Sequence, residues 1–237
     1  MLDEVSEDQP ESHRDTSTDP WTQRFYDRST QGFERVILFS DAVYAIALTL
    51  IAATLVAPTL TSVTTSQDAG AAITGGLSNI AVYAFTFLWI AFYWKANHRF
   101  TLTLQRMDNL YIWAMLTYLA FVALLPFPAS ILAESADPRA LAFFMGYMAC
   151  ISFLEVVLML IAIRNDLLVR TLTTVERRNW VLSALSPVLA AVIAIPACFI
   201  PGIGFAAGIT VLVVVRIAIG FAVKRIYYVP NWSLTRH

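Results

Sequence analysis

The residues of this sequence that could do chemistry are a few charged side chains surrounded by apolar ones. Asp41 lies inside one long apolar stretch, and Glu155 and Arg216 lie inside two others. A charge within the hydrocarbon of a membrane is costly, so each of these residues is a candidate for an ion pathway or for a structural contact. The chain has 3 His and 2 Cys at scattered positions, which excludes the usual spacings of metal sites. We therefore expect no enzyme activity and no cofactor.

Asp41 has two interpretations. It follows Ser40 about two helical turns into the first apolar stretch, with the cationic Arg35 close before it. As an exposed carboxylate it could bind an ion or carry a proton along a pathway. As a structural acceptor it could take hydrogen bonds from a neighbouring helix, because a buried charge needs such partners.

Glu155 and Arg216 are predicted to lie at nearly equal depth in the membrane. Glu155 precedes Arg164 by nine positions, and Arg216 precedes Lys224 by eight, in two stretches that should run in the same direction. An interhelical ion pair is the interpretation that we favour. A proton relay would require more titratable groups in line than the sequence has.

The composition identifies the class of protein to which these residues belong. Hydrophobic residues make up 58% of the 237 positions and charged residues 14%, and the mean hydropathy is +0.64. A water-soluble domain has about 45–50% apolar and about 25% charged residues. The chain is therefore expected to lie in a membrane, in contact with lipid, and the net charge of −1 gives no reason to expect nucleic acid as a partner.

Six apolar stretches are long enough to cross the hydrocarbon, which takes about 20 helical residues. Proline and glycine separate several of them, as at Pro58, Pro138 and the run 201–204. The predicted fold is all-α, with six transmembrane helices near residues 33–57, 73–94, 110–132, 139–163, 180–200 and 203–223.

The basic residues predict the orientation of these helices. All but two of the 16 Lys and Arg residues fall on one side, while Arg139 falls on the other and Arg216 lies within the last helix. The basic side of a membrane protein faces the cytoplasm, so both termini should be cytoplasmic. We expect a disordered acidic tail over 1–32, the membrane domain over 33–226, and a short cytoplasmic tail over 227–237.

The first and second stretches carry the motifs of a known family. The run from Arg35 to Phe39, Ser40 and Asp41 resembles the R-x-x-x-F-S-D signature of the transmembrane protein 175 family, the endosomal and lysosomal potassium channels and their bacterial relatives. The second stretch ends in a segment similar to the family's W-x-x-x-H-x-x-F ending, with Trp94, Asn97 and His98. Leu125-Pro126 resembles the family's kinked element in the third helix. A single six-helix unit is similar to the bacterial branch.

This resemblance implies a homotetramer whose first helices line a central pore in the bacterial plasma membrane. It implies passive conduction of monovalent cations, with K⁺ preferred over Na⁺ and no re-entrant pore loop. Ile46 and Leu50 match the apolar constriction that forms the gate, and Thr49 matches a pore-facing hydroxyl. Ala53 takes the place of a larger apolar residue in bacterial relatives. The signature residues would hold the pore helix in place, and they are Arg35, Phe39, Ser40, Asp41, Trp94, Asn97 and His98.

The residues of the first helix agree with this interpretation but also permit another. A stripe at the spacing of one helix face contains Val43, Ile46, Leu50, Ala53 and Ala57. Such a stripe can face a pore, lipid or another helix. The alternative function is a secondary transporter or a proton-leak pathway that uses Asp41 or Glu155.

Overall fold

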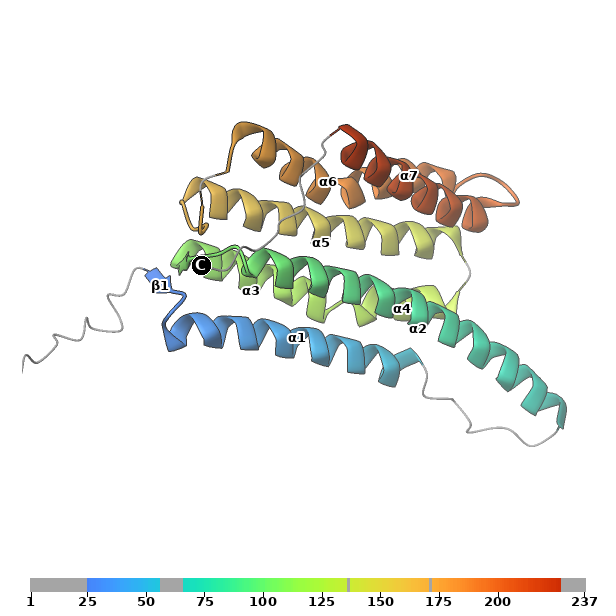
Figure 1. Ribbon diagram of the computed structural model, residues 1–237. Helices are drawn as coiled ribbons and strands as arrows, with labels where there is room; N and C mark the ends of the chain where they lie inside the picture. Colours follow the sequence, from blue (N-terminus) through green and yellow to red (C-terminus); the bar gives the residue numbers. More distant parts are fainter. Residues whose placement is uncertain (1–24, 56–65, 136, 171, 227–237) are drawn as a thin grey trace, which may run out of the picture.

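The chain folds into a bundle of long helices in the computed structural model, which describes residues 25–55, 66–135, 137–170 and 172–226. The helices run side by side, with α1 at one edge, α6 and α7 at the opposite edge and α5 between them (Figure 1). Most of the acidic tail and the C-terminal tail lie outside the described residues. In chain order the elements are β1 (Phe25–Asp27), α1 (Gln31–Leu55), α2 (Ser66–Thr101), β2 (Arg106–Asp108), α3 (Asn109–Ala123), α4 (Pro126–Glu134), α5 (Pro138–Arg164), α6 (Thr174–Ala197) and α7 (Gly204–Ile226).

The helices agree with the all-α prediction, although their lengths differ from the predicted ones. Among the described residues, four spans are long and apolar enough to cross a membrane, at Gln31–Ala53, Asn109–Glu134, Pro138–Arg164 and Thr174–Ala197. Gly204–Ile219 is a shorter apolar helix. The 36 residues of α2 extend over about 54 Å, so this helix is much longer than the expected segment 73–94 and continues past its neighbours (Figure 1).

Proline residues shape two of the helices. The third predicted helix is broken into α3 and α4 at Leu124 and Leu125, just before Pro126. In α6, Pro187 has no N–H to donate to the carbonyl of Ser183, and the hydroxyl of Ser186 donates to that carbonyl instead over 2.7 Å. The freed backbone group is thus satisfied inside the helix.

The segment before α1 is folded, which differs from the predicted disordered tail over 1–32. Residues Phe25–Asp27 form β1, which pairs with β2 in antiparallel register, and α1 begins at Gln31. Arg28 donates to the carbonyl of Leu102 over 2.8 Å, and the guanidinium of Arg106 lies 4.6 Å from the centre of the Phe25 ring. The predicted tail extends too far toward α1 because it rests on the acidic content of the segment. The aromatic residues Phe25 and Tyr26 pack against the core.

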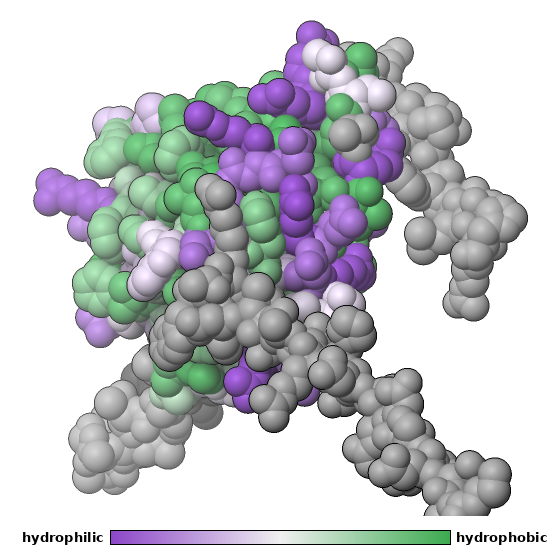
Figure 2. Space-filling model, turned by 90° about the vertical axis from the view of Figure 1, so that its left-hand side faces the viewer, coloured by the Kyte–Doolittle hydropathy of each residue, from purple (hydrophilic) through white to green (hydrophobic). Residues whose placement is uncertain are grey.

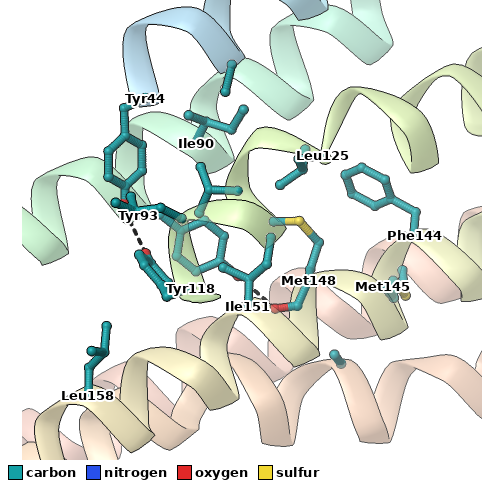
Figure 3. Packing of buried hydrophobic residues seen from close by; sticks show 14 of the residues in the cluster. Tyr44, Ile90, Tyr93, Tyr118, Leu125, Phe144, Met145, Met148, Ile151 and Leu158 are labelled. Atoms are coloured by element: carbon teal, nitrogen blue, oxygen red, sulfur yellow. Dashed lines mark hydrogen bonds between the residues drawn. The ribbon is translucent and has the colours of Figure 1, made fainter. Parts of the chain in front are cut away.

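Hydrophilic residues gather at the end of the bundle that carries β1 and the α5–α6 connection (Figure 2). This end also holds an isolated bridge between Leu104 and Leu168, which joins the α2–α3 and α5–α6 connections. The core between the helices is built largely of aromatic and aliphatic side chains, several of which are shown in Figure 3.

Candidate functional site

Two adjacent residues of α1 bind two residues of α2. The amide of Asn97 donates to the hydroxyl of Ser40 over 3.0 Å, and both side chains are buried. The indole N–H of Trp94 donates to a carboxylate oxygen of Asp41 over 2.9 Å. Trp94 and Asn97 are three positions apart, so they lie on one face of α2 and meet both residues of α1 together. This geometry uses Asp41 as a structural acceptor.

His98 joins this contact through its ring. It lies one turn after Trp94, and the two rings stack with centroids 5.3 Å apart and planes inclined by 20°. The stack restricts the orientation of the indole ring. Trp94, Asn97 and His98 therefore act as one unit against Ser40 and Asp41.

Arg35 and Phe39 lie on the outer face of α1, away from this contact. Phe39 is half exposed, and Arg35 makes no hydrogen bond or ion pair with any residue in the described part of the chain. The expected seven-residue network is thus reduced to five residues within one chain, because Arg35 and Phe39 point away from α2.

The predicted gate residues also lie on the outer face of α1. Ile46 is 55% exposed and Leu50 is 44% exposed, and Thr49 and Ala53 are exposed between and beyond them. The Thr49 hydroxyl donates to backbone carbonyls of its own helix, to Ile46 over 2.9 Å and to Ala45 over 3.1 Å. No other helix of the described chain covers this face.

The predicted stripe does not follow this face over its whole length. Val43 is partly buried and packs against the core, whereas Ile46, Leu50 and Ala53 are exposed. Ala57 lies outside the described residues. The exposed face instead includes the small residues Ala42 and Ala45, which allow another helix to approach closely.

A comparison with protein families matches the segment that contains α1 and α2. Residues 35–126 match the family described as "Endosomal/lysosomal potassium channel TMEM175". Over this segment the chain is similar to the TMEM175 family. The matched segment runs from α1 to the start of α4, so it includes the Ser40 and Asp41 contacts and the exposed face of α1.

A solved structure of a TMEM175 protein has the same fold. This protein is a lysosomal potassium-selective channel TMEM175 homolog from Chamaesiphon minutus, and it superimposes with a TM-score of 0.66 at 20% sequence identity. The likeness covers 82% of this chain and 100% of the other. No curated protein matched the chain. The resemblance predicted from the Arg35–Asp41 run is confirmed, the family is one of channels and not of enzymes, and the chain is a multi-pass membrane protein.

The intramembrane charges outside the TMEM175 segment differ from the prediction. Glu155 on α5 and Arg216 on α7 are not within 4.0 Å of each other, and the salt bridge seen among the described residues joins Arg170 and Glu176 at 2.6 Å. Equal depth was predicted from residue spacing, but spacing does not determine the direction in which a side chain points around its helix.

A group of hydrogen-bonded buried tyrosines was missed by the sequence analysis. The phenol oxygens of Tyr44 and Tyr118 are 2.6 Å apart, which joins α1 to α3. Tyr93 on α2 donates to the carbonyl of Met148 over 2.9 Å and lies 2.7 Å from the hydroxyl of Ser152, which joins α2 to α5. A phenol in an apolar helix resembles an ordinary core aromatic, so the sequence gives no signal for these bonds.

Proposed function

We propose that the chain is one subunit of a potassium-permeable cation channel with six transmembrane helices and cytoplasmic termini. The family described for residues 35–126 is one of potassium channels, and the solved structure of the same fold is described as potassium-selective. In this proposal four subunits surround a central pore that is lined by α1. Conduction is passive, and K⁺ is preferred over Na⁺.

The observation that carries this proposal is the two-sided character of α1. Its inner face binds α2 through Ser40 and Asp41, while its outer face exposes Ile46 and Thr49. Small residues and a hydroxyl are poorly suited to a face that contacts lipid alone, and they suit a face that meets other helices or water. One such face cannot enclose a pore, so a closed ring of subunits is required.

Ile46 forms the gate in this proposal. A narrow ring of apolar side chains stops ions by dewetting, because an ion that passes must lose water with nothing to replace it. Thr49 places a hydroxyl close to the ring, and Leu50 and Ala53 continue the wall beyond it. Hydroxyls replace a hydration shell less completely than stacked carbonyls, so we expect modest selectivity.

The test is an electrical recording of the reconstituted protein with K⁺ on one side and Na⁺ on the other. Ile46→Asn should wet the ring, raise the conductance and lower the preference for K⁺. Leu189→Asn is the matched control, because both residues lie fifteen positions, or about 22 Å, along a helix from its start, and Leu189 is exposed on α6 at the far edge of the bundle. Leu189→Asn should leave the current unchanged.

Two results would contradict the proposal. The first is an unchanged current and ion preference in well-folded Ile46→Asn, since α1 would then not line the narrowest part of the pathway. The second is a functional monomer or dimer in a mass measurement in detergent. Flux that is coupled to a second ion, or proton flux that depends on Asp41 or Glu155, would favour a transporter or a proton leak instead.

A further inference from the structure

The inner face of α1 is held at two points by buried polar side chains. Ser40 binds Asn97 of α2, and one turn later Tyr44 binds Tyr118 of α3. The first contact belongs to the signature described above. The second has no such assignment, and it lies among the buried hydrophobic residues drawn in Figure 3.

The Tyr44–Tyr118 bond lies in a fully desolvated place. Tyr44 is 1% exposed and Tyr118 is 0% exposed, and their oxygens are 2.6 Å apart. Ala47 and Ile51 continue the same buried face of α1 toward its C-terminal end. A phenol that leaves this bond would have to find another partner without help from water, so the bond fixes where α1 sits against α3.

The bond acts at the level of the proposed gate. Tyr44 and Ile46 are two positions apart, which places their side chains about 200° apart around the helix axis. Tyr44 therefore faces into the bundle where Ile46 faces out. A rotation of α1 that moves Ile46 must also move the phenol of Tyr44 away from Tyr118.

We propose that the Tyr44–Tyr118 hydrogen bond is a positioning contact that sets the rotation of α1 at the level of Ile46 and so the fraction of time for which the gate is open. This inference rests on the proposed function, in which Ile46 forms the gate. Tyr44 and Tyr118 act through α1 and do not touch the ion.

The test compares four phenylalanine substitutions, each of which removes one phenol oxygen and keeps the ring. Tyr44→Phe and Tyr118→Phe break the bond to α1. Tyr93→Phe and Tyr147→Phe are matched controls, because Tyr93 joins α2 to α5, and Tyr147 on α5 donates to the carbonyl of Phe121 on α3 over 2.8 Å. All four variants lose a hydrogen bond between helices, but the controls leave α1 untouched.

We expect the open probability to change in Tyr44→Phe and Tyr118→Phe and to stay the same in the two control variants. Tyr44→Phe and Tyr118→Phe should each change the open probability by about fivefold or more, which is the effect of one net hydrogen bond on an equilibrium. The double variant should change it no further than the larger single change, because both substitutions remove the same bond. Tyr93→Phe and Tyr147→Phe should lower thermal stability to a similar degree with an unchanged open probability.

A second measurement tests the positioning role without any current. In a Cys150→Ser background, Ile46→Cys is labelled with a charged thiol reagent, and Tyr44→Phe should change the labelling rate severalfold while Tyr147→Phe should not. Should Tyr44→Phe fail to fold, Tyr118→Phe replaces it in both measurements. The inference would be overturned if all four variants had the same open probability and labelling rate. It would also be overturned if the effects of Tyr44→Phe and Tyr118→Phe on the open probability added up in the double variant. An absence of potassium current in the unmodified protein would instead overturn the proposed function, and the labelling rates would still decide the role of Tyr44.

Discussion

The indole nitrogen of Trp94 lies 2.9 Å from a carboxylate oxygen of Asp41, so a tryptophan of α2 donates a hydrogen bond to the acidic side chain that α1 carries in its apolar stretch. An acidic group at this depth could otherwise serve as an ion or proton site. Here one of its two oxygens accepts a hydrogen bond from Trp94, whose ring stacks against His98. The neighbouring Ser40–Asn97 bond ties the same two helices one position away.

Trp94→Phe should destabilise the protein by removing the donor to Asp41. We expect a loss of about 1 kcal/mol, which is below the usual range for bonds to charged groups because both side chains are partly exposed. The midpoint of thermal unfolding in detergent should fall by about 2–4 °C. Trp113→Phe is the control, since Trp113 is 70% exposed on α3. Equal shifts for the two variants would show that the Asp41 bond contributes nothing.

Ser40→Ala should lower the stability of the protein more than the removal of one small hydroxyl suggests, because it leaves the buried amide of Asn97 without its acceptor. An unsatisfied buried donor costs on the order of 1–3 kcal/mol. Adding Asn97→Leu to Ser40→Ala should recover part of this loss, as the orphaned amide is then gone. Unfolding measurements on the two single variants and the double variant check this expectation. Ser130→Ala, which removes a hydroxyl bonded to its own helix, should have little effect, and strictly additive losses at positions 40 and 97 would contradict the pairing.

Thr49→Val should lower conductance and leave folding intact. The Thr49 hydroxyl binds only backbone carbonyls of α1 among the described residues, so its removal breaks no contact between helices. In the proposed pore it removes four hydroxyls close to the gate. Thr117→Val provides the control, because Thr117 is also exposed and donates to the backbone of its own helix α3. A single-channel recording in which both variants conduct equally would remove Thr49 from the pathway.

Glu155→Gln and Arg216→Gln should show a coupling energy smaller than that of a buried contact pair. Breaking a direct buried ion pair costs roughly 3–5 kcal/mol, but these two groups are more than 4.0 Å apart and make no direct ion pair in the described part of the chain. We expect a coupling on the order of 1 kcal/mol, with partial recovery in the double variant. A coupling of 3 kcal/mol or more in a double-mutant cycle would show that the two side chains are in direct contact.

The sequence predicts the depth of a residue in the membrane better than its direction around a helix. Hydropathy and proline positions predicted where helices lie, and the break at Leu125-Pro126 is where the helix divides into α3 and α4. Depth alone also predicted the Glu155–Arg216 pair, which the structure does not form. The direction of a side chain depends on how neighbouring helices pack, and this information is spread over many residues.

The contacts that tie α1 to the bundle were predictable to different degrees. Ser40 and Asp41 carry polar groups in an apolar helix, so partners on α2 could be expected for them. Tyr44 gave no such signal, because its ring accounts for its burial whether or not its oxygen is bonded. The pairing of Phe25–Asp27 with β2 was also missed, since three-residue strands have too little pattern to be recognised.

The pairing of β1 with β2 also limits the order in which parts of the protein can fold during synthesis. A ribosome makes the N-terminal part first, yet β1 pairs with residues Arg106–Asp108, which follow α2. Until about eighty further residues have been made, β1 has no strand to pair with, and the N-terminal end of α1 is not held by the sheet. α1 is therefore synthesised long before the strand that pairs with β1, and the pairing can form only when the nascent chain has reached the start of α3.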